Sequence, residues 1–287
     1  MSATTKNLSD RLSLALDWIS LSGETSRRLL ELETIGLYLF LYAPVFVVVV
    51  LSFTPKSIPA FPMPGVSLKW YAKLVPPGYD EELIGALATS IKLGVSAAVG
   101  SAVVGTGAAI GMVRNDYGGW LFDNDTLNTV FIAPMMVPWI VTGIAVLSLY
   151  SLLNVSGTFL SLVVGHVLIT LPFMTVVVAG QLYGFDRSLE EAARNLGAGP
   201  LRTFYEVTLP LIAPGIVAGM MFAFTISFDN FTQTFFWTSS TLNTLPIVIY
   251  SRINFGLTPV INAMGTIVVA ISLTLAFLAE RLSNRLL

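Results

Sequence analysis

The chain has 287 residues, of which 54% are hydrophobic and only 11% are charged, and its mean hydropathy is +0.77. A soluble globular protein is about 25% charged, so this composition excludes a soluble enzyme and indicates an integral membrane protein. The net charge of −2 argues against a nucleic-acid partner, and a chain with no cysteine and one histidine has no disulfide framework, thiolate site or His-rich metal site.

The first 34 residues precede any span-length apolar segment. They lack the charged-then-apolar order of a cleavable signal. An apolar stripe at helical spacing, formed by Leu8, Leu12, Ala15 and Ile19, predicts a cytoplasmic amphipathic helix. We therefore expect an N-terminal segment, 1–34, followed by a transmembrane domain, 35–287.

Six segments are long and apolar enough to cross a bilayer, which takes about 20 apolar residues. They run from Ile35 to Phe53, Leu83 to Val113, Leu127 to Leu153, Thr158 to Leu182, Leu211 to Trp237 and Pro259 to Leu282. No stretch shows the alternation of barrel strands. The sequence thus predicts an all-α, polytopic bundle of about six transmembrane helices, with kinks at Pro134 and Pro138 in the third and Pro172 in the fourth.

The distribution of basic residues predicts the orientation, because cytoplasmic loops carry the excess of Lys and Arg. With the N-terminus inside, the inner segments hold Lys6, Arg11, Arg27, Arg28, Arg114, Arg187, Arg194, Arg202, Arg281 and Arg285. The outer segments then hold only Lys56, Lys69, Lys73 and Arg252. Both termini are therefore expected to be cytoplasmic. The proline-rich outer stretch from Thr54 to Glu82 is expected to be extended.

Glycines within the second and fifth spans predict close helix packing. Gly107 and Gly111 form one GxxxG face, and Gly215 and Gly219 form another. A phosphate-binding loop would require a Gly-Lys pair, and the sequence contains none. We therefore expect no ATP hydrolysis by this chain.

The inner stretch 186–210 is expected to form two short helices. Ser188 and Glu191 have the spacing of a capping box. Gly197 stands where a left-handed residue ends a helix, Pro200 suits the first turn of a second helix, and Pro210 is expected to end that helix. Such a rigid helix–turn–helix between two spans suits a lever, although an ordinary solvated loop has the same local pattern.

The same stretch resembles the EAA loop of permease subunits from bacterial ABC importers. Glu191-Ala192-Ala193 is followed by Gly197, Val207 and Leu209-Pro210 at the spacing of that motif, with Val207 where the family most often has Ile. Further stretches resemble the spermidine/putrescine-type branch: Gly165-His166, Leu171-Pro172-Phe173, Ser227-Phe228-Asp229, Thr244-Leu245-Pro246 and Ile249-Tyr250.

This resemblance implies a type I importer in the bacterial inner membrane and a non-catalytic role for this chain. Its partners would be two ATPase subunits that bind ATP and Mg, a second and different permease, a periplasmic binding protein and membrane lipid. The 186–210 stretch would be the coupling loop that docks on the ATPase. Its implied coupling residues are Glu190, Glu191, Ala192, Ala193, Arg194, Leu196, Gly197, Leu209 and Pro210.

Ionisable residues inside the spans mark candidate positions along the substrate pathway. An aspartate at a helix centre costs about 2.5–3.5 kcal/mol to insert, and Asp229 lies about 27 Å along the fifth span. We expect it to face inward and to hold a cationic cargo or to pair within the bundle. His166 lies at similar depth on the fourth span, so the two side chains can pair. The other candidates are Ser227, Phe228, Asn230 and Trp139.

Asn230 stands where many polyamine-type permeases have a second acid, which leaves a singly charged, zwitterionic or anionic cargo open. A stand-alone secondary transporter or channel that uses Asp229 and His166 is the alternative function. It would be expected to show inverted repeats and several buried charges. A membrane-embedded enzyme lacks a credible catalytic set, because the spans hold no paired carboxylates.

Overall fold

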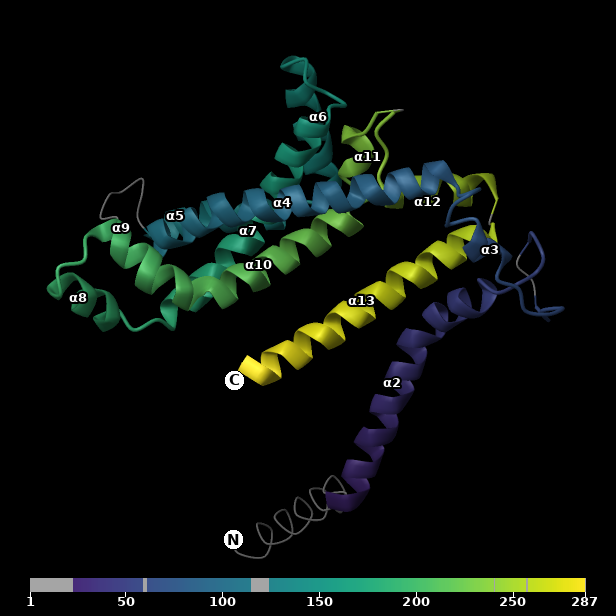
Figure 1. Cartoon of the computed structure of the whole chain (residues 1–287), viewed down its shortest axis with the longest axis horizontal. Helices are drawn as coiled ribbons and strands as arrows, with labels where there is room; N and C mark the ends of the chain where they lie inside the picture. The colour runs from purple at the N-terminus through teal and green to yellow at the C-terminus, as the bar shows by residue number, and fades with distance from the viewer. Residues whose placement is uncertain (1–22, 59–60, 115–123, 240, 257, 287) are drawn as a thin grey trace, which may run out of the picture. The chain divides into compact units, whose positions relative to one another are not determined.

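A computed structural model describes residues 23–58, 61–114, 124–239, 241–256 and 258–286. Within these ranges every element is helical, apart from one isolated bridge between Ser239 and Leu242. The chain divides into two compact units, one formed by Met1–Gly78 with Leu257–Leu287 and the other by Tyr79–Gly256 (Figure 1). The expected amphipathic helix around Leu8–Ile19 lies outside the described residues.

The first unit contains α2 (Gly23–Leu51), α3 (Lys69–Ala72) and α13 (Pro259–Leu286), and α13 packs against both of the others. α2 runs without interruption past residue 34. The stretch after α2 is less extended than expected, because the indole N–H of Trp70 donates to the carbonyl of Thr54 at 2.7 Å. The hydroxyls of Ser52 and Tyr71 are 2.6 Å apart, so α3 is fastened to the end of α2.

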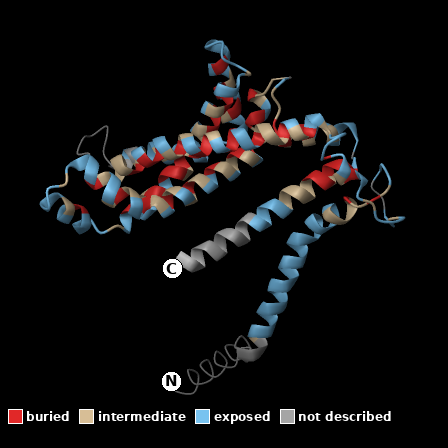
Figure 2. Cartoon of the chain, viewed as in Figure 1, coloured by how far each residue is buried: buried red, intermediate tan, exposed pale blue. Residues whose placement is uncertain are grey.

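The second unit is built on three long helices that pack against one another: α4 (Glu81–Arg114), α7 (Phe159–Tyr183) and α10 (Leu209–Asp229). Buried residues follow the contacting faces of these helices (Figure 2). One core cluster gathers Ala109, Met174, Val178, Leu182 and Ile212 from all three. The shorter helices of this unit are α5 (Asn124–Met136), α6 (Trp139–Leu152), α8 (Ser188–Asn195), α9 (Pro200–Thr203), α11 (Thr234–Trp237) and α12 (Leu245–Phe255).

Of the helices in the described ranges, four are long and apolar enough to cross a membrane, and α5 with α6 makes a fifth if that bent pair is one span. The pair is bent by 104° between Met136 and Trp139. The third expected span is thus broken rather than merely kinked, because Pro138 leaves the helical conformation with ψ of 131°. The sixth expected span corresponds to the helix α13, of which the apolar part within the described residues, Pro259–Thr274, is shorter than a full span.

The fifth expected span ends early. α10 stops at Asp229, and Asn230 is extended, with ψ of 109°. α11 begins only at Thr234. Asn230, Gln233 and Thr234 form hydrogen bonds with one another at this corner, which replaces the helical hydrogen bonds. The span predicted from apolar composition, which continues to Trp237, is therefore too long.

The glycine packing faces are only partly as expected. Gly215 and Gly219 do lie against α7, because an added Cβ would meet Gln181 at 2.9 Å and Met174 at 2.3 Å respectively. Gly107, in contrast, has nothing within 4 Å of its Cβ position. The close approach on α4 is instead made by Gly94, Gly100 and Gly105, because spacing along a helix does not reveal which face meets a neighbour.

Candidate functional site

The first helix of the coupling loop is α8, and its start differs from the predicted capping box. Asp186 Oδ1 accepts from the Ser188 N–H at 2.9 Å, and no side chain caps the helix at Arg187. The backbone and side-chain hydrogen bonds from Ser188 hold the pKa of the Asp186 carboxyl below its ordinary value. Asp186 therefore closes the turn into α8, and Glu191 is left exposed.

The end of α8 confirms the predicted left-handed glycine. Gly197 has φ of 89°, and its N–H donates to Arg194 O at 2.9 Å while the Ala198 N–H donates to Ala193 O at 3.0 Å. This pair of bonds is the Schellman arrangement. Pro200 begins α9 as expected. The loop therefore reverses over a few residues with its last carbonyls paired.

Substitution of Gly197 with alanine is expected to loosen this turn. The Cβ position is open, so the whole cost comes from a left-handed backbone and amounts to about 1 kcal/mol. Hydrogen exchange at the amides of residues 197 and 198 should accelerate about fivefold. Gly199→Ala is the matched control, because Gly199 also has open space but an ordinary φ of −69°. Equal exchange in both variants would contradict the assignment.

The second half of the loop does not end at Pro210. α9 continues into a π-helical turn, η1 (Phe204–Thr208), and then directly into α10. Pro210 has no N–H to give to the preceding turn, and a π-turn is one way in which a helix absorbs such an interruption. The loop and the fifth span are consequently one continuous helix from Pro200 to Asp229.

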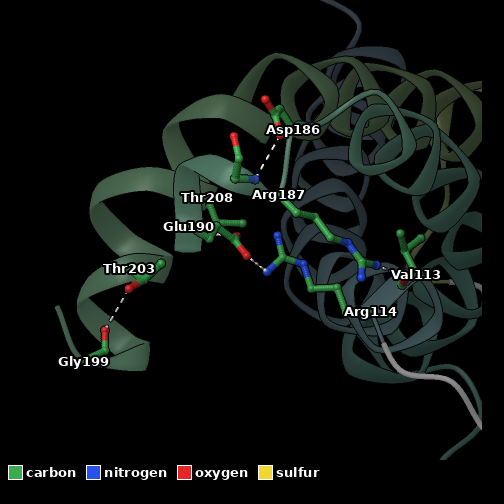
Figure 3. Close-up of polar contacts among 9 residues, drawn as sticks. Val113, Arg114, Asp186, Arg187, Glu190, Gly199, Thr203 and Thr208 are labelled. Carbon is green, nitrogen blue, oxygen red and sulfur yellow. Dashed lines mark hydrogen bonds and ion pairs between the residues drawn. The ribbon is translucent and has the colours of Figure 1, made fainter. Parts of the chain in front are cut away.

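Glu190, on α8, connects the loop to two other elements. One carboxylate oxygen accepts from Arg114 at the end of α4, and the other accepts from the Thr208 hydroxyl at the end of η1 (Figure 3). Burial alone would raise the pKa of Glu190, but these hydrogen bonds and the charge of Arg114 outweigh it, so the pKa lies below its ordinary value. Arg187 adds a bond of 2.7 Å to the carbonyl of Val113.

The outward side of the loop presents large apolar side chains. Leu196 is 90% exposed, Leu201 74% and Tyr205 63%. We call these three residues the apolar docking face. Glu191, Ala192 and Arg194 are exposed as well, Ala193 is half-buried, and Leu209 and Pro210 lie in the first turn of α10. Large apolar side chains exposed on a loop that also carries charged residues are typical of a surface that a partner covers.

A buried polar network joins α7 to the corner between α10 and α11. His166 Nδ1 lies 2.7 Å from Ser227 Oγ, and His166 Nε2 lies 3.1 Å from Thr234 Oγ1. The predicted pairing of His166 with Asp229 is therefore wrong. Ser227, two residues earlier on α10, occupies the face towards His166, whereas Asp229 points to the exposed face.

Asn230 caps the start of α11. Its Oδ1 accepts from the N–H groups of Gln233 and Thr234 at 3.2 and 3.1 Å, and its Nδ2 donates to Gln233 Oε1 at 2.6 Å. Gln233 in turn donates to Thr142 Oγ1 at 2.7 Å. Asn230 is thus a structural cap. Gln233, which sequence reasoning missed, is a buried link between α11 and α6.

A mostly enclosed cavity of about 120 Å³ lies beside this network. Trp139 lines it together with Phe173 and Ile226, and Gln233 and Thr142 supply its polar wall. Asp229 lies one turn beyond Ile226 on α10, and its carboxylate has no hydrogen bond or ion pair within the described ranges. Phe228 stacks on Phe224, with ring centroids 5.7 Å apart. The cavity thus has an apolar, aromatic wall, and the exposed carboxylate of Asp229 lies outside its lining.

The chain matches the family of binding-protein-dependent transport system inner membrane components over residues 107–287. It is 32% identical over 254 residues to the putrescine transport system permease protein PotI of Escherichia coli (strain K12), covering 86% of this chain and 88% of that protein. It is also 32% identical to the spermidine/putrescine transport system permease protein PotC of Haemophilus influenzae, covering 86% and 93% of the two chains.

Two solved structures share the fold. A bacterial ABC transporter involved in import of the acidic polysaccharide alginate matches with a TM-score of 0.67 at 14% identity, over 92% of this chain and 98% of that one. The MetNI methionine ABC transporter, in inward-facing conformations, matches with a TM-score of 0.59 at 16% identity, over 71% and 96%.

Proposed function

Because the chain belongs to the family of binding-protein-dependent transport system inner membrane components, we propose that it forms half of the path by which an ATP-driven importer brings a small cationic amine into the cell. The chain is a multi-pass permease subunit of the bacterial inner membrane. It works with an ATPase and other subunits of an ABC importer and is itself non-catalytic.

The amine cargo is supported by the two polyamine relatives and by Asp229. The fold alone does not select a cargo, because one of its structural matches imports an acidic polysaccharide. Asp229 supplies the negative charge that a protonated amine needs at membrane depth. Trp139 and Phe173 line a cavity that also includes Ile226, one turn before Asp229 on the same helix, and aromatic faces of this kind suit a cationic amine. The single observation that carries the proposal is the exposed carboxylate of Asp229 at the end of α10, which has no hydrogen bond or ion pair within the described ranges.

The partner set is proposed as two ATPase subunits, a second and different permease, and a periplasmic binding protein that delivers the amine. The apolar docking face (Leu196, Leu201 and Tyr205) supports the place of the ATPase, because these large apolar side chains are exposed on either side of the tight turn at Gly197. Glu191 and Arg194 add exposed charge to the same loop. Such a face fits a groove that is apolar at its centre and polar at its rim.

The first test is purification of the tagged chain from mild detergent with mass spectrometry of the proteins that accompany it. Wild type should bring an ATPase and a second permease, and the purified complex in liposomes should take up putrescine only with ATP. Leu196→Asn, which makes the docking face polar, should lose the ATPase but retain the second permease.

Leu160→Asn is a matched control in which a similarly exposed leucine, 71% exposed on α7, is made polar away from the loop. It should keep both partners. A chain that purifies alone and moves solute without ATP would contradict the importer, and uptake of anionic but not cationic solutes would contradict the amine.

A further inference from the structure

Glu190 is the only carboxylate that is buried in the part of the chain described by the structure. Its residue is 6% exposed, whereas Glu191, its neighbour in the same helix, is exposed. A buried carboxylate is costly unless it is paired and hydrogen-bonded. The position of Glu190 therefore depends on its partners, and these come from two other helices.

Both oxygens of Glu190 are engaged within the chain. Arg114 is the last residue of α4, and Thr208 is the last residue of η1, directly before α10. One side chain thus connects α8 to two of the three long helices of its unit (Figure 3). We call Glu190, Arg114 and Thr208 the loop clamp.

The loop clamp is poorly explained by stability alone. A buried ion pair is often no more stable than an apolar replacement, because both charges lose water. Arg114 also keeps one buried nitrogen, Nη2, without a hydrogen-bond partner in the described ranges. The ion pair between Arg114 and Glu190 instead fixes the position of α8 relative to α4, although the two residues are 76 positions apart in the sequence.

The loop clamp is also separate from the apolar docking face. Leu196, Leu201 and Tyr205 are exposed, while the carboxylate of Glu190 is turned towards α4. α4 is about 50 Å long and packs along α7 and α10. The second half of the loop already continues into α10 as one helix, so α8 is the part of the loop whose displacement depends on side-chain contacts to reach the membrane helices.

We propose that Glu190 is a positioning residue, which with Arg114 and Thr208 makes the coupling loop move as one body with α4 and α10. This proposal rests on the proposed function, since it assigns how a push from the ATPase reaches the membrane helices. In this proposal Glu190 forms contacts only within this chain, and the exposed residues of the loop contact the ATPase.

The first test compares Glu190→Gln with Glu191→Gln in the complete importer in liposomes. Both changes remove one negative charge from α8, but only the first breaks the clamp. Glu190→Gln and Arg114→Gln should lower the amount of putrescine moved per ATP hydrolysed about tenfold, because a lost bond to a charged partner costs that much or more. The ATPase should still co-purify. Arg114→Lys should retain most of the coupling.

A second test needs no transport. Trypsin can cut the isolated full chain in detergent after Arg194 and Arg202, which are both exposed. Glu190→Gln should speed these cuts about tenfold, and Glu191→Gln should not. Glu206→Gln is a further control, because it breaks the exposed pair between Arg202 and Glu206, which are 69% and 59% exposed, and such pairs contribute little.

Each result decides the proposal. Unchanged cleavage in Glu190→Gln would show that no clamp holds the loop. Faster cleavage with unchanged transport per ATP would make the clamp a stabilising contact only, and loss of the ATPase would make Glu190 part of the docking surface. Either would overturn the positioning role. If the wild-type complex moves no solute with ATP, the proposed function fails, and the cleavage comparison alone decides the clamp.

Discussion

Replacing Asp229 with asparagine is expected to lower ATP-driven putrescine uptake by about 10- to 100-fold, the range for loss of a hydrogen bond to a charged group. Asparagine has nearly the same shape, so the change removes the charge and little else. Initial rates of labelled putrescine uptake, measured over a range of concentrations in liposomes, will show the effect as a higher KM, a lower maximal rate or both.

The carboxylate of Asp229 is exposed on the single chain at the outer end of α10. An aspartate that faces lipid is costly, by about 2.5–3.5 kcal/mol at a helix centre, so we expect Asp229 to face the solute path or the second permease. Asp229→Glu keeps the charge and should keep most of the uptake. If Asp229→Asn instead releases the second permease, Asp229 is an assembly contact. Normal uptake with normal assembly would remove it from the pathway altogether.

The helices that the sequence predicted well are those whose limits are set by composition. α4 and α7 match their expected spans within two residues, because charged or polar residues lie at both ends of long, largely apolar runs. The corner at Asn230 shows the limit of this reasoning. Asn230, Gln233 and Thr234 are polar residues inside an apolar window, and a cluster of such residues favours a break in the helix.

The turn of the coupling loop was predictable because its signals are local. Gly197 and Pro200 each act through their own backbone, so their positions in the sequence are sufficient. The loop clamp was not predictable in this way. Arg114 and Glu190 meet only after α4 and α7 have packed, and a single sequence carries no signal of a contact between residues so far apart.

Depth along a helix also proved insufficient to predict a contact. His166 and Asp229 were expected to pair because they lie at similar depths, but a helix turns about 100° per residue. Ser227 faces His166 instead. The same reasoning explains the error at Gly107, which lies two residues from the close contact made by Gly105. Sequence spacing identifies a stripe of residues, and only packing decides which stripe is buried.

Met174 packs between two glycines in the three-helix core. A methyl group added to either glycine is expected to disrupt the packing of this core. Met174 is fully buried on α7. An added Cβ at Gly219 on α10 would lie 2.3 Å from its sulfur, and one at Gly105 on α4 would lie 2.8 Å from its Cγ. Because each glycine lies against the same side chain, Met174 has little room to retreat from either.

Gly219→Ala and Gly105→Ala are therefore expected to lower the free energy of unfolding by about 1–3 kcal/mol, the usual cost of overpacking a core, measured by denaturant unfolding of the purified chain in detergent. Gly107→Ala is the matched control: its Cβ enters open space, and alanine favours a helix over glycine by about 1 kcal/mol, so this variant should be unchanged or more stable. The double variant Gly219→Ala/Met174→Ala, in which the side chain at position 174 is shorter, should recover part of the lost free energy of unfolding. If Gly219→Ala is as stable as Gly107→Ala, α7 and α10 are not in the close contact that this core requires.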